Sequence, residues 1–359
     1  MVKQLACLLL WAASLGACLD VAEERARNDA RVGSAQVQGL SVRVGHGAAA
    51  VRELRRDSLQ LWASAPQLEI KLEVAAPTAF SLRIQNAMPD GRLVSDTLEV
   101  REREREIATD VTYDIELPAG DSVLRFSVPD ADVAEPFRFA VFADVQEAID
   151  SVQDIYRRMN QTPQLRFVVM SGDLTQRGTI PQLQRFQREL RGLKLPCFST
   201  LGNHELGDAD DNYQRFFGRG SQHFLFKGAH FTLLDDASAT IAPQVYSWLD
   251  GWLREGRDAF HSVYMHLPPL DTSGIRNGAL ASRAEADMLL SKLARSGVDL
   301  TIYGHVHTYD AFTNAGIPAF ISGGGGAIPE RFDHIGRHFL VVDVDPTSQQ
   351  QQTAIVHVD

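Results

Sequence analysis

Five short apolar runs in the second half of the chain each end beside polar side chains that can bind metal ions. The runs cover residues 139–143, 167–170, 197–201, 262–265 and 300–303, and they are followed by Asp144, Asp173, Asn203, His266, and His305 with His307. Because the carboxyl ends of strands in open α/β sheets form one edge, we expect these side chains to converge on one crevice. Taken singly, each has an ordinary alternative as a helix cap, a turn residue or a hydrogen-bonded histidine. Their joint recurrence at strand ends favours a metal centre.

The segments between these runs have the pattern of amphipathic helices. Apolar residues recur at helical spacing in 148–159, 182–190, 244–254 and 282–295. Buried strands that alternate with such helices are typical of an α/β domain. We therefore assign residues 137–359 to an α/β domain that carries the candidate metal ligands.

Residues 37–130 have a different pattern, that of a small antiparallel β-sandwich. Short segments such as 68–74 alternate apolar and polar residues, and turn signals at 89–91 and 118–121 separate such segments. The run 101–106 alternates arginine and glutamate, which we interpret as an exposed edge strand protected by charge rather than as a docking patch.

The first 18 residues resemble a bacterial lipoprotein signal peptide. Lys3 precedes an apolar segment, and the Leu-Gly-Ala-Cys order of residues 15–18 is that of a lipobox, in which Cys18 is the lipidated residue. The alternative is an ordinary secretory signal in which Cys18 is incidental. Residues 19–36 contain few apolar side chains, so we expect them to form a flexible tether. We therefore expect an exported protein of a bacterial cell envelope, periplasmic or on the outer surface, that contacts the membrane only through its lipid anchor.

Charge and cysteine content restrict the remaining chemistry. The 359-residue chain has a formal net charge of -11, which disfavours nucleic acid as a partner. An acidic protein can still act on a small phosphate ester if metal cations supply positive charge locally. Of the three cysteines, Cys7 and Cys18 fall in the signal region, so only Cys197 remains. It lies in an apolar strand and is assigned no catalytic role.

The order of the polar residues also resembles the motif pattern of a known family. The blocks are Asp144-Val145-Gln146, Gly172-Asp173, Gly202-Asn203-His204-Glu205, His266 and Gly304-His305-Val306-His307. They are similar to the Asp-x-His, Gly-Asp, Gly-Asn-His-Asp/Glu, His and Gly-His-x-His blocks of calcineurin-like metallophosphoesterases. The resemblance covers about residues 137–345 and implies a two-sheet α/β sandwich flanked by helices, with a dinuclear metal centre at the strand ends.

The resemblance also implies roles for individual residues. Asp173 would bridge two divalent metal ions; one site would be completed by Asp144, Gln146 and His307, and the other by Asn203, His266 and His305. A bridging hydroxide would then attack phosphorus directly. His204 would act as general acid or as a donor to the phosphate, and Glu205 would orient it.

One block departs from the family pattern, because Gln146 stands where most members have histidine. The amide oxygen is a harder ligand than imidazole nitrogen, so the identity of the metals (Mn, Fe, Zn or Mg) stays open, with Mn²⁺ favoured. Gln176 likewise replaces an aspartate of many members. The neighbouring Arg177 is either a phosphate contact or a surface ion-pair residue.

These observations predict a lipid-anchored, metal-dependent hydrolase of phosphate mono- or diesters. The alternative is a non-catalytic surface lipoprotein that binds glycan or protein through the β-sandwich, and Gln146 is its only direct support. Segments 206–219 and 271–280 are the expected specificity loops. The sequence does not fix the physiological substrate or the oligomeric state.

Overall fold

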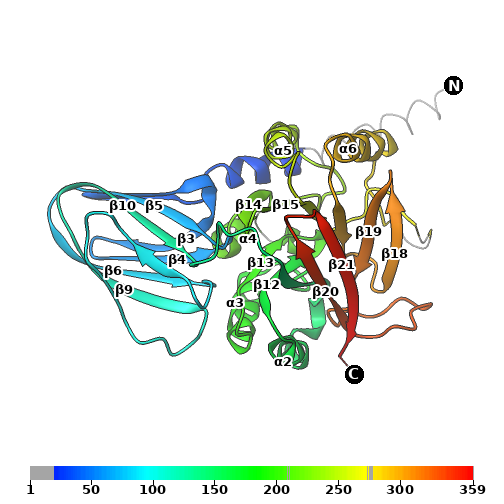
Figure 1. The fold of residues 1–359 in the computed structure, drawn as a ribbon, viewed down its shortest axis with the longest axis horizontal. Helices are drawn as coiled ribbons and strands as arrows, with labels where there is room; N and C mark the ends of the chain where they lie inside the picture. The colour runs from blue at the N-terminus through cyan, green and yellow to red at the C-terminus, as the bar shows by residue number, and fades with distance from the viewer. Residues whose placement is uncertain (1–19, 208, 210, 273, 275–277, 359) are drawn as a thin grey trace.

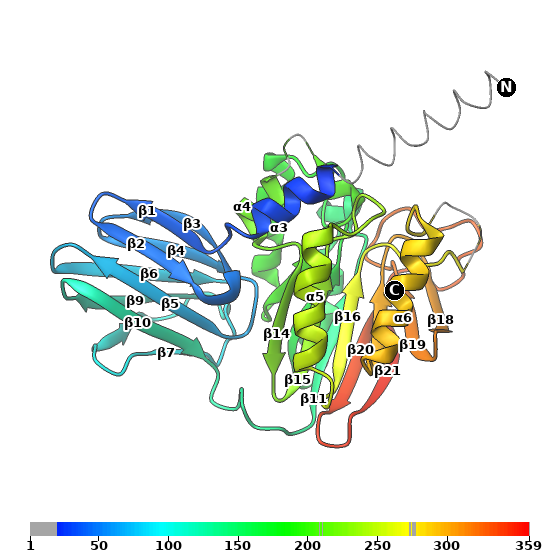
Figure 2. The ribbon, with the colours of Figure 1, turned by 90° about the horizontal axis from the view of Figure 1, so that it is seen from above.

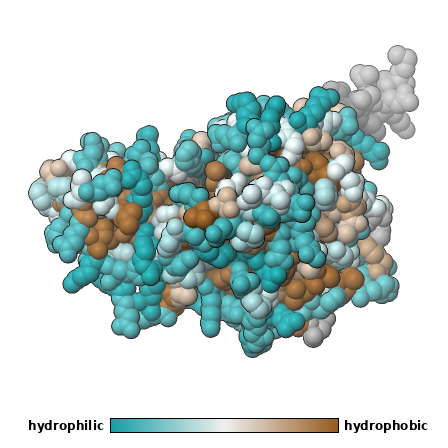
Figure 3. Space-filling model, in the orientation of Figure 1, coloured by the Kyte–Doolittle hydropathy of each residue, from teal (hydrophilic) through white to brown (hydrophobic). Residues whose placement is uncertain are grey.

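The computed structural model describes residues 20–207, 209, 211–272, 274 and 278–358, which form a β-sandwich followed by an α/β domain (Figure 1). The predicted signal peptide and Cys18 lie outside the described residues. Among these, no helix is both long enough and apolar enough to cross a lipid bilayer. On the face shown in Figure 3, hydrophilic residues predominate and apolar residues form small separate areas.

Two five-stranded sheets form the N-terminal sandwich. One has the order β1-β2-β5-β10-β7 and the other β3-β4-β6-β9-β8. The strands are β1 (Ser34–Val37), β2 (Leu40–Val44), β3 (Ala49–Arg55), β4 (Ser58–Ala63), β5 (Leu68–Val74), β6 (Thr78–Gln85), β7 (Arg92–Val94), β8 (Val100–Glu102), β9 (Asp110–Leu117) and β10 (Gly120–Ser127). In β5 every second side chain is buried, which is the reason for the alternating sequence.

The alternating arginine and glutamate run contains an edge strand, as the sequence indicated, but a short one. Strand β8 ends at Glu102 and pairs only with β9. The side chains of Arg101 and Arg103 both donate to the carboxylate of Asp114 on β9. The charges therefore protect a sheet edge and are satisfied within the sandwich.

The α/β domain consists of two mixed sheets with helices outside them. Their orders are β13-β12-β11-β20-β21 and β14-β15-β16-β17-β19-β18. The strands are β11 (Phe137–Phe142), β12 (Leu165–Ser171), β13 (Cys197–Thr200), β14 (Gln222–Phe226), β15 (Ala229–Leu234), β16 (His261–Met265), β17 (Leu300–Tyr303), β18 (Tyr309–Asn314), β19 (Ile317–Ser322), β20 (His338–Asp345) and β21 (Gln350–His357). The helices are α2 (Gln153–Gln161), α3 (Ile180–Glu189), α4 (Asn212–Phe217), α5 (Pro243–Glu255) and α6 (Arg283–Arg295).

Aromatic side chains fill the space between these two sheets. Phe139 and Phe167 stack with ring centroids 5.4 Å apart, and both meet Phe231 of the other sheet edge-on, at 5.2 and 5.3 Å. Such pairs each contribute about 0.5–1.5 kcal/mol beyond burial of their area. The same apolar core continues into the sandwich, where it includes Leu61 and Leu82. The predicted fold class, a two-sheet α/β sandwich preceded by an all-β sandwich, is confirmed.

The prediction of a flexible tether over residues 19–36 was wrong. Residues 20–29 are helical and lie across one end of the α/β domain, shown in dark blue in Figure 2. Ala22 and Ala26 are buried, and Arg25 forms a buried ion pair with Asp235. The Asp29 carboxylate accepts hydrogen bonds from the backbone N–H groups of residues 220 and 221. The lack of large apolar residues was misleading, because this helix packs against the domain through small side chains and through buried, paired charged groups.

The predicted helix over 148–159 is interrupted. A 3₁₀ turn covers Gln146–Asp150, and α2 begins at Gln153. The other three predicted helices are present as α3, α5 and α6, and Ser282 caps α6 by accepting from the backbone N–H of Glu285. The helical periodicity therefore located the helices correctly, except that residues 151 and 152 separate the 3₁₀ turn from α2.

A candidate dinuclear metal centre

The structure brings all the predicted metal ligands and His204 together at the carboxyl ends of the strands. They follow five strands, of which β11, β12 and β13 belong to one sheet and β16 and β17 to the other. Four of them have positive φ, a left-handed conformation that costs a non-glycine residue on the order of 1–3 kcal/mol. They are Asp144 (64°), Gln146 (47°), Asp173 (53°) and His305 (68°). Strain concentrated on these turns indicates a functional site.

Asp173 lies at the centre of the group and is fully buried. Its Oδ2 atom is 2.7 Å from Nε2 of Gln146 on one side and 3.3 Å from Nε2 of His266 on the other. Its Oδ1 atom accepts a hydrogen bond of 2.9 Å from the backbone N–H of His204. One carboxylate therefore joins two sets of candidate ligands, as the bridging role requires.

The first set contains Asp144, Gln146 and His307. Nε2 of His307 is 3.5 Å from Oδ1 of Asp144 and 3.1 Å from Nε2 of Gln146. Nδ1 of His307 is 2.6 Å from the carbonyl oxygen of Ile328, which can only accept, so Nδ1 carries the proton. This bond leaves the Nε2 lone pair directed into the site, the tautomer that metal ligation needs. A rotation of the Gln146 amide would direct its oxygen the same way.

The second set contains Asn203, His266 and His305. Oδ1 of Asn203 is 3.0 Å from Nε2 of His266 and 2.9 Å from Nδ1 of His305. Nδ1 of His266 donates to the carbonyl oxygen of Ser171 at 2.9 Å, so its Nε2 faces Asn203 and Asp173. His305 therefore presents Nδ1 to the site, whereas His266 and His307 present Nε2.

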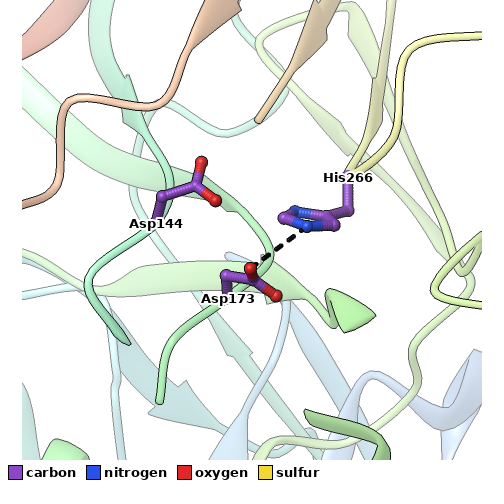
Figure 4. A group of neighbouring side chains, drawn as sticks. All are labelled: Asp144, Asp173 and His266. Atoms are coloured by element: carbon purple, nitrogen blue, oxygen red, sulfur yellow. Dashed lines mark ion pairs between the residues drawn. The ribbon is translucent and has the colours of Figure 1, made fainter. Parts of the chain in front are cut away.

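The electrostatics of the site favour cations. Ligand atoms of Asp144, Asp173 and His266 lie within 4.8 Å of one another, and Figure 4 shows the His266 ring directed at Asp173 with Asp144 beside it. Burial alone would lower the pKa of His266, but Asp173, Asp144 and Asp236 raise it to about 10. Burial would raise the pKa of Asp173, yet His266 and His204 hold it below its usual range. The buried carboxylates thus make the site electrostatically favourable for bound cations.

The donor set fits two divalent cations. It offers carboxylate and amide oxygens together with imidazole nitrogens, the mixture that Mn²⁺, Fe²⁺ and Zn²⁺ accept. Glycines allow the ligand loops to approach this closely. A Cβ on Gly202 would lie 2.2 Å from Oδ1 of Asp173, and one on Gly304 would lie 2.8 Å from Oδ2 of Asp144. The glycines of the motifs are therefore required by the packing of the carboxylates.

His204 lies beside the two sets with 28% of its side chain exposed. Its Nε2 is 3.9 Å from Oδ2 of Asp173, and its Nδ1 donates to the carbonyl oxygen of Gln176 at 2.7 Å. The prediction that Glu205 orients His204 was wrong. Glu205 is buried on the other side of the turn, where it accepts from the backbone N–H groups of Thr175 and Gly202. A backbone carbonyl orients the imidazole instead.

Three features of the site escaped the sequence analysis. Strand β15 ends at Leu234, and Asp236 just beyond it accepts hydrogen bonds from the backbone N–H groups of His266 and Leu267. The apolar run that ends at this aspartate follows the same rule as the five runs identified, so it was detectable. The carbonyl oxygens of Ser171 and Ile328, which fix the histidine tautomers, have no signal in sequence because every residue carries one.

Other residues that the sequence analysis singled out do not join the centre. Arg177 is exposed, and its backbone N–H donates to Gln182. The glycine-rich turn of residues 323–326 packs against the Asp144 loop, since the backbone N–H of Gly325 donates to the carbonyl of Ala143. Cys197 is buried, burial raises its pKa to about 12, and it has no place in the site. The two expected specificity loops are only partly within the described residues.

Comparison with known proteins finds similarity over this region. Residues 137–309 match the family model described as calcineurin-like phosphoesterase. A 3′,5′-cyclic-nucleotide phosphodiesterase from Nostoc sp. is 24% identical over 169 residues, and a protein named "Probable cyclic nucleotide phosphodiesterase" from Rhodopseudomonas palustris is 28% identical over 189. These matches cover 44% and 47% of this chain, and 62% and 67% of the two relatives.

Solved structures share the fold over a longer stretch. A purple acid phosphatase from yellow lupin seeds aligns with a TM-score of 0.54 at 11% identity, covering 82% of this chain and 70% of the other. PhoD aligns with a TM-score of 0.50 at 11% identity, covering 81% of this chain and 86% of its own. Alignments of that length cannot be contained within residues 137–359, so they include part of the N-terminal sandwich.

Proposed function

Since residues 137–309 match the family model of calcineurin-like phosphoesterases, we propose that this protein hydrolyses small phosphate esters with the help of two divalent metal ions. One ion would be held by Asp144, Gln146, Asp173 and His307, and the other by Asp173, Asn203, His266 and His305. The observation that carries the proposal is the position of Asp173, whose Oδ2 atom faces both sets of ligands. When bound, two such cations polarise phosphoryl oxygens and activate water as a nucleophile.

The protein's own residues position the substrate and move the proton. His204 is partly exposed next to Asp173, and its Nδ1–H donates to the carbonyl oxygen of Gln176. Its Nε2 is therefore free to approach the substrate, either donating a hydrogen bond to the phosphate or protonating the leaving oxygen. Both roles require a proton on Nε2 in addition to the one on Nδ1. His204 is thus the proposed catalytic residue.

The proposal covers phosphate monoesters and diesters alike. The two curated relatives carry names of cyclic nucleotide phosphodiesterases, so a 3′,5′-cyclic nucleotide belongs in the substrate panel. Anchoring through Cys18 and export to a bacterial cell envelope complete the proposal; they rest on the lipobox order of residues 15–18.

The decisive experiment compares esters that do and do not need a proton donor. We expect the chelated chain, refilled with Mn²⁺, Mg²⁺, Zn²⁺ or Fe²⁺, to hydrolyse p-nitrophenyl phosphate, bis-p-nitrophenyl phosphate or a cyclic nucleotide. Replacement of His204 by alanine should lower kcat by about 10²–10⁴-fold if it is a general acid. The loss should be much smaller for p-nitrophenyl esters, because nitrophenolate leaves without a proton.

Two results would separate the alternatives. Equal losses on both kinds of ester would assign His204 to phosphate binding rather than to proton transfer. Absence of turnover on every ester with every metal, in a folded chain that binds the metals, would contradict the proposal and favour a non-catalytic surface lipoprotein. His223→Gln, in the same domain but far from the centre, is the matched control and should keep full activity.

A further inference from the structure

Four exposed apolar side chains lie on segments that follow the ligand-bearing strands, at the same edge of the α/β domain as the metal centre. Ile180 begins α3 on the chain that leaves Asp173, Leu270 follows His266, and Ile328 and Phe332 lie in the loop whose carbonyl fixes His307. Their exposed fractions are 38%, 39%, 71% and 38%. We call these four residues the apolar rim. Four other large hydrophobic residues in the described part of the chain are similarly exposed, and they are scattered over the sandwich, the linker, β14 and α6.

The N-terminal helical segment lies at this same end of the domain. Arg25 donates to the carboxylate of Asp235, which directly follows β15, and the neighbouring Asp236 accepts from the backbone of His266. Figure 2 shows this dark blue helical segment above α5, running from the sandwich toward the side of the α/β domain where β16 and α6 lie. The ion pair of Arg25 is buried, so this segment is fixed on the domain.

Little chain separates this fixed point from the candidate lipidation site. Only residue 19 stands between Cys18 and residue 20, and two residues of extended chain span at most about 7 Å. A lipid on Cys18 would therefore hold this end of the α/β domain at the bilayer surface. An anchor on Cys18 would leave the sandwich without a role as a spacer, because the chain would reach the α/β domain before the sandwich.

We propose that the edge carrying the metal centre and the apolar rim faces the lipid bilayer, so that the site takes phosphate esters presented at the lipid surface. This proposal rests on the proposed function and on lipidation of Cys18. The apolar rim would enter the interfacial region, with the exposed Arg177 and Arg331 beside it at the level of the head groups. The occupant of this surface is thus a membrane rather than a second protein, since the anchor brings the membrane to it.

The orientation can be tested without any enzyme assay. After signal cleavage and lipidation of Cys18, the remaining native cysteine is Cys197, whose buried thiol has a raised pKa and resists labelling. Phe332→Cys and Val94→Cys in the full, lipidated chain can each carry an environment-sensitive fluorophore; Val94 is an exposed residue of β7 in the sandwich. In phosphatidylglycerol/phosphatidylethanolamine vesicles we expect a blue shift and quenching by brominated lipid for residue 332 only. Water-like emission at 332, or equal quenching at both positions, would overturn the proposed orientation.

A kinetic comparison tests whether the site acts on phosphate esters at the lipid surface. The lipidated chain should hydrolyse a p-nitrophenyl phosphodiester with a long alkyl chain, embedded in those vesicles, several-fold faster than the Leu270→Ser/Phe332→Ser variant does, with equal rates on soluble bis-p-nitrophenyl phosphate. Equal rates of both proteins on the embedded ester would overturn the proposed use of lipid-surface substrates. If neither protein hydrolyses the soluble ester, the proposed function has failed, and the fluorescence result still decides the orientation.

Discussion

Histidines gather at both ends of strand β16, and the two ends have opposite chemistry. His261 is its first residue, and His266 follows its last, which places them about 17 Å apart along the strand. At the far end, His261 and His230 are buried, and His223 lies partly buried beside them. Nε2 of His223 is 2.9 Å from Nδ1 of His230, and His223 stacks on Trp252. Burial and the neighbouring histidines lower the pKa of His261 and of His223 to about 3.

The difference lies in the acidic side chains. At the metal end, Asp144, Asp173 and Asp236 surround His266 and raise its pKa to about 10 despite complete burial. At the far end, aromatic and histidine side chains pack together, and the imidazoles stay neutral. A cluster of histidines therefore becomes a candidate cation site only where strand ends also deliver carboxylates. His223, His230 and His261, which we call the far cluster, are therefore part of the packed interior and not a candidate cation site.

The largest difference in hydrolysis rate should come from substitutions at the two ends of β16. Asp173→Asn removes the charge shared by both ligand sets, so we expect hydrolysis to fall by at least about 10³-fold, more than the 10–100-fold that loss of an outer partner costs. His223→Gln should leave the rate within about twofold. Steady-state kinetics with p-nitrophenyl esters measures both. Substantial activity in Asp173→Asn would contradict the central role of this residue.

The ion pair behind the metal end should matter for stability. Arg25→Ala leaves Asp235 buried and unpaired close to Asp29, and the loss of one partner of a buried pair costs about 3–5 kcal/mol in the free energy of unfolding. Arg27→Ala, which removes an exposed pair with Glu23, should cost less than about 1 kcal/mol. Urea unfolding of both variants tests this. Equal stabilities would restore the tether interpretation of residues 20–29.

Metal binding should stabilise the folded chain through the ligands at the carboxyl end of β16, and not through the far cluster. At a Mn²⁺ concentration about 100-fold above its dissociation constant, we expect the free energy of unfolding to rise by about 2.7 kcal/mol per site. Thermal unfolding with and without Mn²⁺ measures the effect. Asp173→Asn should abolish it, while His223→Gln should keep it. A Tm shift that persists in Asp173→Asn would place the bound metal elsewhere.

The far cluster should respond to acid. The pKa of His261 in the folded chain is lowered to about 3 from an ordinary value of 6.5, so its contribution to stability is present above pH 6.5 and is lost as pH falls toward 3. Between pH 7 and pH 5 this amounts to about 2 kcal/mol. Urea unfolding of chelated wild type should show a loss larger by about that amount than His261→Gln shows. Parallel pH dependence of the two proteins would mean that His261 takes up its proton without unfolding.

Much of the metal end was predictable because its signals are local. Each predicted ligand lies within four residues of the end of a short apolar run, and β11, β12, β13, β16 and β17 lie where those runs predicted them. The tether prediction failed because Arg25 finds its partner 210 residues away, at Asp235. The Glu205 prediction failed because adjacency in sequence says nothing about the direction of a side chain, and Glu205 turns toward Thr175.

The sequence by itself determined the types of ligand, their order and their places at strand ends, because buried strands and the polar turns after them are encoded by neighbouring residues. Only the tertiary structure decided that Asp173 lies between two ligand sets, that carbonyl oxygens of Ser171 and Ile328 set the histidine tautomers, and that residues 20–29 pack beside the centre. These features depend on contacts between segments far apart in the chain. Their energies arise from burial and charge pairing, which exist only once the sheets have assembled.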